Sequence, residues 1–173
     1  MAQRDINLEN ITFLIADPHD GSRKLMGDIL LAIGARDVIQ LSTPETASAC
    51  LKADPVDFLF CDFNLGKGQG AQLVRDLRAD RDHPARYIPV IMTCSHTRLI
   101  DLQRVRDCGA NMLLAKPYSV SALYDRLSWV AHQPRAFVSS RGYCGPDRRV
   151  KLEDVEHEDR RSDEMPKKAA AAG

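Results

Sequence analysis

Four polar side chains stand at or just past the carboxyl ends of short apolar runs. They are Asp17, Asp62, Thr93 and Lys116. The run that ends at Asp62 continues at once into a glycine-rich turn, residues 63–70. An aspartate in this position can simply terminate a strand, because Asp starts turns well, or it can be held at the edge of a sheet to react. Lys116 precedes Pro117, which disfavours helical backbone at Lys116 and so directs its ammonium along the same edge.

A carboxylate, a lysine and a hydroxyl gathered at one point suit phosphoryl transfer. The lysine neutralises the charge of the phosphoryl group, and the hydroxyl donates a hydrogen bond to its oxygens. A divalent ion can bridge carboxylate and phosphoryl oxygens. This chemistry requires the four side chains to meet at one edge of one sheet.

Five apolar runs, separated by helical patterns, predict the elements that position these side chains. The runs are ITFLIA (11–16), DVIQL (37–41), VDFLFC (56–61), PVIMT (89–93) and NMLLA (111–115). Runs this short and this uniformly apolar favour parallel strands that are covered on both faces. Five β-α repeats predict an α/β fold with a doubly wound, five-stranded parallel sheet. Ligands of such sheets bind beyond the carboxyl ends of the strands, where all four polar side chains are expected.

The predicted helices carry apolar stripes and end signals. The stripes are Leu25, Ile29 and Ile33; Leu73, Val74 and Leu77; Leu99, Leu102 and Val105; and Leu123, Leu127 and Val130. Gly34 and Gly109 follow helices where a left-handed cap is favoured. Ser42 or Thr43, before Pro44, is the predicted N-cap of the second helix.

Composition restricts the class of protein. The 173 residues are 44% hydrophobic and 28% charged, as in globular proteins. Lys+Arg and Asp+Glu number 24 each, and this balance argues against broad electrostatic binding of nucleic acid or anionic membranes. Five cysteines without a CxxC pair indicate reduced, packed thiols. No signal peptide or membrane span is recognised, so we expect a cytoplasmic protein.

The pattern changes near the end of the last predicted helix. We expect an N-terminal arm, a domain, a candidate docking segment and a disordered, charged, irregular tail, at residues 1–9, 10–133, 134–149 and 150–173. Phe137, Val138 and Tyr143 form an apolar group that the domain or a partner should cover. Residues 145–147, Gly-Pro-Asp, are predicted to form a turn that presents two arginines, residues 148–149.

The ordered set of Asp17, Asp62, Thr93 and Lys116-Pro117 resembles the receiver domain of two-component response regulators, over about residues 10–132. Asn64 and Gly70 stand where this family places a metal-binding backbone carbonyl and its usual glycine. The resemblance implies a flavodoxin-like strand order, 2-1-3-4-5. It also implies that Asp62 accepts a phosphoryl group from the phosphohistidine of a histidine kinase or a histidine phosphotransfer protein.

The resemblance further assigns the neighbouring groups. Lys116 would pair with the phosphoryl group and Thr93 would bind its oxygens. Asp17, Asp62 and the backbone carbonyl of Asn64 would hold Mg²⁺. The protein would be a phosphoacceptor and not itself an enzyme, because a phosphatase that uses an aspartyl nucleophile would need a second acid where Asn64 stands.

Three positions differ from the family pattern: Pro18, Leu113, and Gly66, where a proline is common. Pro18 replaces the second of two adjacent acids, and by this alignment the missing acid is the closer metal ligand, so Mg²⁺ binding should be weakened. Asp20 can assist the metal or cap a helix that begins near Ser22, and capping is favoured. Leu113 stands where many receivers have an aromatic residue whose rotation reports phosphorylation.

Two functional hypotheses therefore stay open. The first is a single-domain, chemotaxis-regulator-like response regulator, a monomer or weak homodimer. It would signal to a downstream target protein through its fourth helix, fifth strand and fifth helix. The second is a degenerate receiver that binds proteins without phosphorylation. The residues after the domain are too few for a winged helix and lack a basic stripe, so no nucleic-acid or membrane partner is expected.

Overall fold

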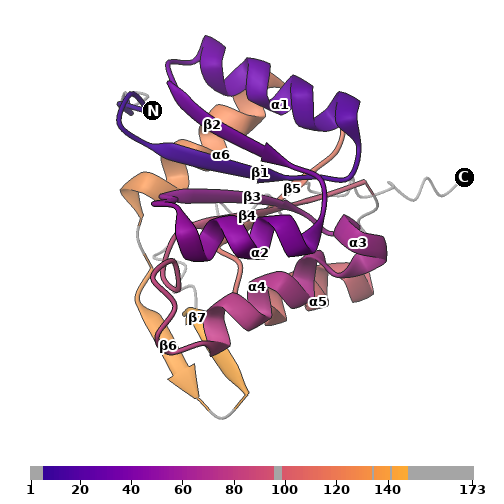
Figure 1. Cartoon of the computed structure of the whole chain (residues 1–173), viewed down its shortest axis with the longest axis vertical. Coiled ribbons are helices and arrows are strands. Elements are labelled where there is room, and N and C mark those ends of the chain that lie inside the picture. The colour runs from indigo at the N-terminus through magenta and orange to yellow at the C-terminus, as the bar shows by residue number, and fades with distance from the viewer. Residues whose placement is uncertain (1–5, 96–98, 134, 141, 148–173) are drawn as a thin grey trace, which may run out of the picture.

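A computed structural model describes residues 6–95, 99–133, 135–140 and 142–147, and its centre is a five-stranded parallel sheet (Figure 1). The strands are β1 (Thr12–Ala16), β2 (Asp37–Leu41), β3 (Phe58–Asp62), β4 (Val90–Cys94) and β5 (Met112–Ala115). Their order is β2-β1-β3-β4-β5, and all four pairings are parallel. The predicted doubly wound sheet and its strand order are therefore confirmed.

Helices cover both faces of the sheet. They are α1 (Asp20–Ala32), α2 (Pro44–Ala53), α3 (Leu65–Gly68), α4 (Gly70–Ala79), α5 (Leu99–Asp107) and α6 (Val120–His132). Residues of α1 and α6 pack into one apolar cluster, and residues of α2, α4 and α5 pack into the other, so the sheet lies between two layers (Figure 1). Within the described residues, no helix is long and apolar enough to cross a membrane.

The strands read as continuous apolar runs because both of their faces are buried. Every residue of β3 and β4 is buried, which is the pattern of central parallel strands. On the α1 side, the rings of Phe13, Phe58 and Phe60 pack together with centroids 5.1–6.3 Å apart. This packing fixes the strands whose carboxyl ends carry the polar groups.

Two of the predicted helix stripes are buried as expected, and a third is correct at two of its three residues. All of Leu73, Val74, Leu77, Leu123, Leu127 and Val130 lie in the core. In α1, Ile29 is buried and Ile33 packs against the core, but Leu25 is 54% exposed, and Met26 and Leu30 are buried instead. The sequence offers two adjacent apolar stripes on this helix, and packing against the sheet selects the one that starts at Met26. Val105 of the α5 stripe is buried, whereas the side chains of Leu99 and Leu102 lie outside the described residues.

The predicted end signals agree with the structure for α2 and for two glycines. Thr43 is the N-cap of α2, and its hydroxyl accepts a hydrogen bond from the Thr46 backbone at 3.2 Å. Gly34 and Gly109 have φ values of 106° and 92°, in the left-handed region that favours glycine.

A two-stranded antiparallel hairpin follows α6, and it was not predicted. Its strands are β6 (Phe137–Ser140) and β7 (Tyr143–Pro146), and β7 lies against α4 (Figure 1). The Phe137 ring stands edge-on to the Tyr87 ring, with centroids 5.3 Å apart. The base of the hairpin is held by Arg135, whose guanidinium donates to the Asn111 carbonyl and stacks on Trp129.

One prediction about this segment needs correction, and another is met in part. Phe137 is partly covered by the domain, whereas Val138 is exposed on it, because successive side chains of a strand point to opposite faces. Gly145 and Pro146 belong to β7 and do not form a turn, since Gly145 pairs with Val138 across the hairpin. The two arginines at 148–149 and the charged tail at 150–173 lie outside the described residues.

Gly70 at the start of α4 lies so close to the backbone of Asp62 that a Cβ atom there would clash with the Asp62 carbonyl oxygen. We predict that Gly70→Ala lowers the free energy of unfolding by about 1–3 kcal/mol, because the new methyl group must displace the end of β3. Gly21→Ala is the matched control, since a Cβ at Gly21 meets no atom within 4 Å. Urea denaturation measures both variants, and equal stability of the two would contradict this packing constraint.

Candidate functional site

The four polar residues predicted from the sequence meet at the carboxyl end of the sheet. Asp17 and Lys116 directly follow β1 and β5, Asp62 ends β3, and Thr93 lies in β4. Asp62 and Thr93 are partners in the β3–β4 register. The Thr93 hydroxyl donates to Asp62 Oδ2 at 3.2 Å. The sheet topology therefore brings together groups that lie far apart in the sequence.

Lys116 joins the two carboxylates. Its Nζ lies 2.6 Å from Asp17 Oδ2 and 2.5 Å from Asp62 Oδ2. Asp17 and Asp62 are 3% and 2% exposed, so these ion pairs are largely removed from solvent. Two buried acids that contact the same side chain require that side chain to be a cation, because an uncompensated buried charge is costly.

Backbone amides orient both carboxylates from the other side. Asp17 Oδ1 accepts from the His19 amide at 2.8 Å, and Asp62 Oδ1 accepts from the Asn64 amide at 2.8 Å. These contacts form because the chain turns immediately after each aspartate. In each carboxylate, one oxygen therefore accepts a hydrogen bond from an amide of its own loop, and the other oxygen accepts one from Lys116.

The charged form of Lys116 is favoured by this setting. Burial by itself lowers the pKa of the Lys116 ammonium, but its hydrogen bonds to Asp17 and Asp62 and their charges outweigh burial, so the pKa is raised. The neighbouring Tyr118 hydroxyl has a raised pKa, mainly because it is buried. Lys116 is therefore a permanent positive charge at the centre of the site.

The oxygen atoms of the site are of the kind that a hard divalent cation prefers as ligands. Asp17 and Asp62 supply carboxylates, which Mg²⁺ accepts together with water and phosphate oxygens. The third predicted donor, the Asn64 carbonyl, also accepts a hydrogen bond from the Gly68 amide at 3.3 Å. In the described part of the chain, no cluster of three or more His, Cys, Asp or Glu side chains is arranged to hold a metal. A metal here would therefore depend on two carboxylates and few other protein ligands.

The residues around Asp17 differ partly from expectation. Helix α1 begins at Asp20, before the expected Ser22, and its N-cap is His19, so the prediction that Asp20 caps the helix is wrong. The exposed Asp20 instead pairs with Arg23, with Nη2 and Oδ1 2.6 Å apart. Arg23 also donates to the Asp17 carbonyl at 2.7 Å. The sequence analysis missed Arg23, although an aspartate and an arginine three residues apart at a helix start were a usable signal.

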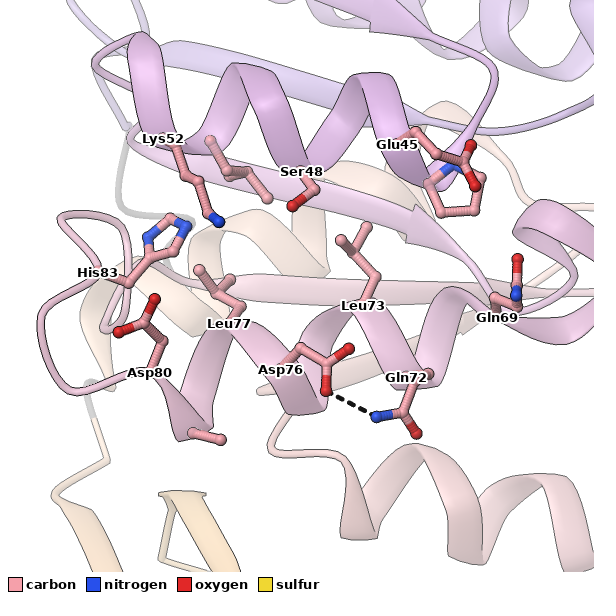
Figure 2. Close-up of a pocket in the computed structure, with 13 residues that line it drawn as sticks. Glu45, Ser48, Lys52, Gln69, Gln72, Leu73, Asp76, Leu77, Asp80 and His83 are labelled. Atoms are coloured by element: carbon pink, nitrogen blue, oxygen red, sulfur yellow. Dashed lines mark hydrogen bonds between the residues drawn. The ribbon is translucent and has the colours of Figure 1, made fainter.

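A separate hollow of about 530 Å³ lies between α2 and α4, shown in Figure 2. Glu45, Asp76, Asp80 and Lys52 give it charges of mixed sign, and its floor includes Leu73 and Leu77. Asp17, Asp62, Thr93 and Lys116 do not line this hollow. Its side chains are therefore not part of the carboxylate site.

Comparison with known proteins gives the family. The model of the response regulator receiver domain matches residues 13–128. Chemotaxis protein CheY-3 of Vibrio cholerae is 25% identical over 119 residues, which are 69% of this chain and 90% of the relative. A probable chemotaxis protein CheY of Rhizobium etli is 27% identical over 115 residues, or 66% of this chain and 88% of that protein.

Solved structures agree on the fold. A putative response regulator from Chloroflexus aurantiacus superposes with a TM-score of 0.65 at 25% identity, covering 72% of this chain and 100% of that one. The receiver domain of the Pseudomonas aeruginosa sensor histidine kinase PA1611, described with a magnesium ion in its active-site cleft, gives 0.61 at 21% identity, covering 70% and 96%. Receiver domains act in two-component signalling, generally bind Mg²⁺, and interact with histidine kinases or phosphotransfer proteins. This chain belongs to the response regulator receiver domain family.

Proposed function

We propose that the protein is a single-domain response regulator that accepts a phosphoryl group on Asp62. The observation that carries the proposal is the pair of short contacts from Lys116 to Asp17 and Asp62, beside the Thr93 hydroxyl. The donor would be the phosphohistidine of a histidine kinase or a histidine phosphotransfer protein. The protein would not turn over a substrate of its own, and we expect it in the cytoplasm.

In the proposed transfer, a carboxylate oxygen of Asp62 attacks phosphorus while the bond from phosphorus to the donor histidine nitrogen breaks. The Lys116 ammonium neutralises charge on the incoming phosphoryl group, and the Thr93 hydroxyl turns from Asp62 to one of its oxygens. The Asn64 amide holds the carboxylate in place. When bound, Mg²⁺ would neutralise further phosphoryl charge, held by Asp17, Asp62 and the Asn64 carbonyl.

The proposed output surface comprises α5, β5 and α6. These are the elements expected from sequence as the fourth helix, fifth strand and fifth helix, and the short helix α3 raises the helix numbers by one. Thr93 lies in β4, directly before the segment that leads into α5, so a hydroxyl that moves toward a phosphoryl group can reposition that segment. Leu113, in the place of the family's aromatic residue, is half-buried and packs against the core. We therefore expect the change to be transmitted through Thr93 while Leu113 merely repacks, and a downstream target protein to read it.

The alternative is a receiver that binds partners without phosphorylation. One observation favours it: Asp17 and Asp62 have both of their carboxylate oxygens occupied by Lys116 and loop amides. A site whose carboxylate oxygens already have hydrogen-bond partners can hold its shape without a ligand. The following predictions separate the two functions.

Beryllofluoride with Mg²⁺, a stable mimic of a phosphoryl group on aspartate, should shift the amide resonances of Asp62, Thr93 and Lys116. Asp62→Asn should abolish the shifts, because the amide cannot replace the attacking carboxylate. Asp28→Asn is the control, since Asp28 is exposed on α1 and lies outside the site. A wild-type spectrum that does not change at high Mg²⁺ would favour the phosphorylation-independent module.

Pro18→Asp should strengthen Mg²⁺ binding by about tenfold or more, because a carboxylate next to Asp17 adds charge and a ligand where the metal has few. Pro18→Ala is the control, as it removes the ring without adding charge. Calorimetric titration with Mg²⁺ gives the dissociation constants. Equal affinity of Pro18→Asp and Pro18→Ala would show that the missing acid does not limit metal binding.

Lys116→Met should lower the free energy of unfolding by about 3 kcal/mol, because it leaves two buried carboxylates without their cation. Lys24→Met, at an exposed position of α1, should have little effect. Since the pKa of Lys116 is raised on folding, its stabilisation is complete below the ordinary lysine pKa of 10.5 and is lost as pH rises through the higher folded value.

The difference between wild type and Lys116→Met should therefore stay constant from about pH 7 to 9 and shrink in more alkaline solution. Urea denaturation at several pH values measures it. A Lys116→Met protein as stable as wild type at neutral pH would contradict the proposed role of the ion pairs.

A further inference from the structure

A hollow of about 300 Å³ lies where the β6–β7 hairpin meets the end of α4, and it is lined by an unusual number of arginines. Arg75 and Arg78 come from α4, and Arg81 and Arg86 come from the segment that follows it. Arg78 also donates to the carbonyl of Ile88 at 2.7 Å, just before β4, so this hollow is at the end of the sheet opposite Asp62. It is therefore separate from the carboxylate site.

The positive charge of this hollow is not balanced by its own acids. Asp107 is the acidic residue in the lining, and it pairs with Arg106, with Nε and Oδ1 3.2 Å apart. Arg78 and Arg86 donate to neutral acceptors: Arg78 to the carbonyls of Gly109, Arg86 and Ile88, and Arg86 to the Arg78 carbonyl and Cys144 Sγ. Within the described part of the chain, no carboxylate pairs with either guanidinium.

Burial makes this imbalance costly. Arg78 is 1% exposed, and burial, the largest influence, lowers its pKa to about 10. Arg78 is also fixed by the hairpin, since the Phe137 ring lies 4.9 Å from its guanidinium carbon. An anion in the hollow would offset the desolvation of these charges.

Some hydrogen-bond donors of the residues that line the hollow have no partner in the described part of the chain. Arg86 is 9% exposed, and its Nε and Nη2 have partners, whereas its Nη1 has none in the described part of the chain. Among the described residues, Arg135 Nε is the one side-chain nitrogen or oxygen that is both buried and without a partner. Arg86 Nη1 has no partner and does not belong to this class, so it is accessible to solvent. The exposed hydroxyls of Ser139 and Ser140 line the hollow from β6.

We propose that this arginine hollow is a binding site for a small ligand that carries phosphate groups. Arginines of α4, arginines of the segment after it and the serine hydroxyls of β6 line the hollow on three sides. This arrangement suits the tetrahedral oxygens of a phosphate. A planar carboxylate would need only one guanidinium, which can bind both of its oxygens. The volume fits a small molecule. Because the hairpin supplies one wall, the ligand would also hold β6 and β7 against α4.

The test is a titration of the full chain with inorganic pyrophosphate at constant ionic strength, followed by amide resonances. Saturable shifts should appear in residues 75–86, 139–140 and 142–145. Arg75→Gln and Arg81→Gln should each weaken binding about tenfold, as expected for the loss of one charged hydrogen-bonding partner. Both residues are exposed, so the variants should remain folded. Arg126→Gln, an exposed arginine of α6 outside the hollow, removes the same charge and should leave the affinity unchanged.

Two outcomes would overturn the proposal. One is a response that is absent, does not saturate, or weakens as much in Arg126→Gln as in Arg75→Gln and Arg81→Gln, which would mean nonspecific attraction to a positive surface. The other is citrate binding as tightly as pyrophosphate at the same ionic strength, which would reject phosphate as the preferred group. Pyrophosphate binding that depends on Arg75 and Arg81 and exceeds citrate binding would support it.

Discussion

One ammonium between two buried carboxylates is the constraint on which the rest of the site depends. Asp17 follows β1, Asp62 ends β3, and Lys116 follows β5, so the lysine side chain crosses the end of β4 to reach both acids. Only a long side chain can span this distance, and only a closely packed parallel sheet keeps the strand ends in place. The ion pairs at 2.6 Å and 2.5 Å thus link the edge strand β5 to the inner strands β1 and β3. This arrangement explains why a buried strand can end on an aspartate.

The backbone near Asp62 is restricted from a second direction. Gly70 brings the start of α4 against the Asp62 carbonyl, and the Thr93 carbonyl accepts a hydrogen bond from the Phe63 amide at 2.8 Å. Carboxylate, loop and neighbouring strand therefore form one rigid unit. At the opposite end of the sheet, the hairpin and the end of α4 bring four arginines together.

Much of this was predictable from sequence because the parallel sheet has a strong signal. Strands buried on both faces appear as apolar runs, and the residues after them must share one edge, so the meeting of Asp17, Asp62, Thr93 and Lys116 follows from topology. The phase of α1 was not predictable, since Leu25 and Met26 both continue apolar stripes and only contact with the sheet distinguishes them.

Two other features were missed for different reasons. The hairpin depends on contacts that local patterns do not encode, because Phe137 packs against Tyr87 and Arg78 on a distant part of the domain. Asp20 was misassigned for a local reason: His19 takes the N-cap position, while Asp20, one residue on, is the first helical residue and pairs with Arg23.

The most direct test of the central claim is transfer of a phosphoryl group to the protein from a histidine phosphotransfer protein that carries radiolabelled phosphohistidine. The products would be digested, and the labelled peptide identified by mass spectrometry. The proposed function predicts one label, on the peptide that contains Asp62, which alkali and hydroxylamine release, as expected for an acyl phosphate. A label on another residue, or no transfer from any phosphohistidine donor while the protein still binds its partner, would contradict it.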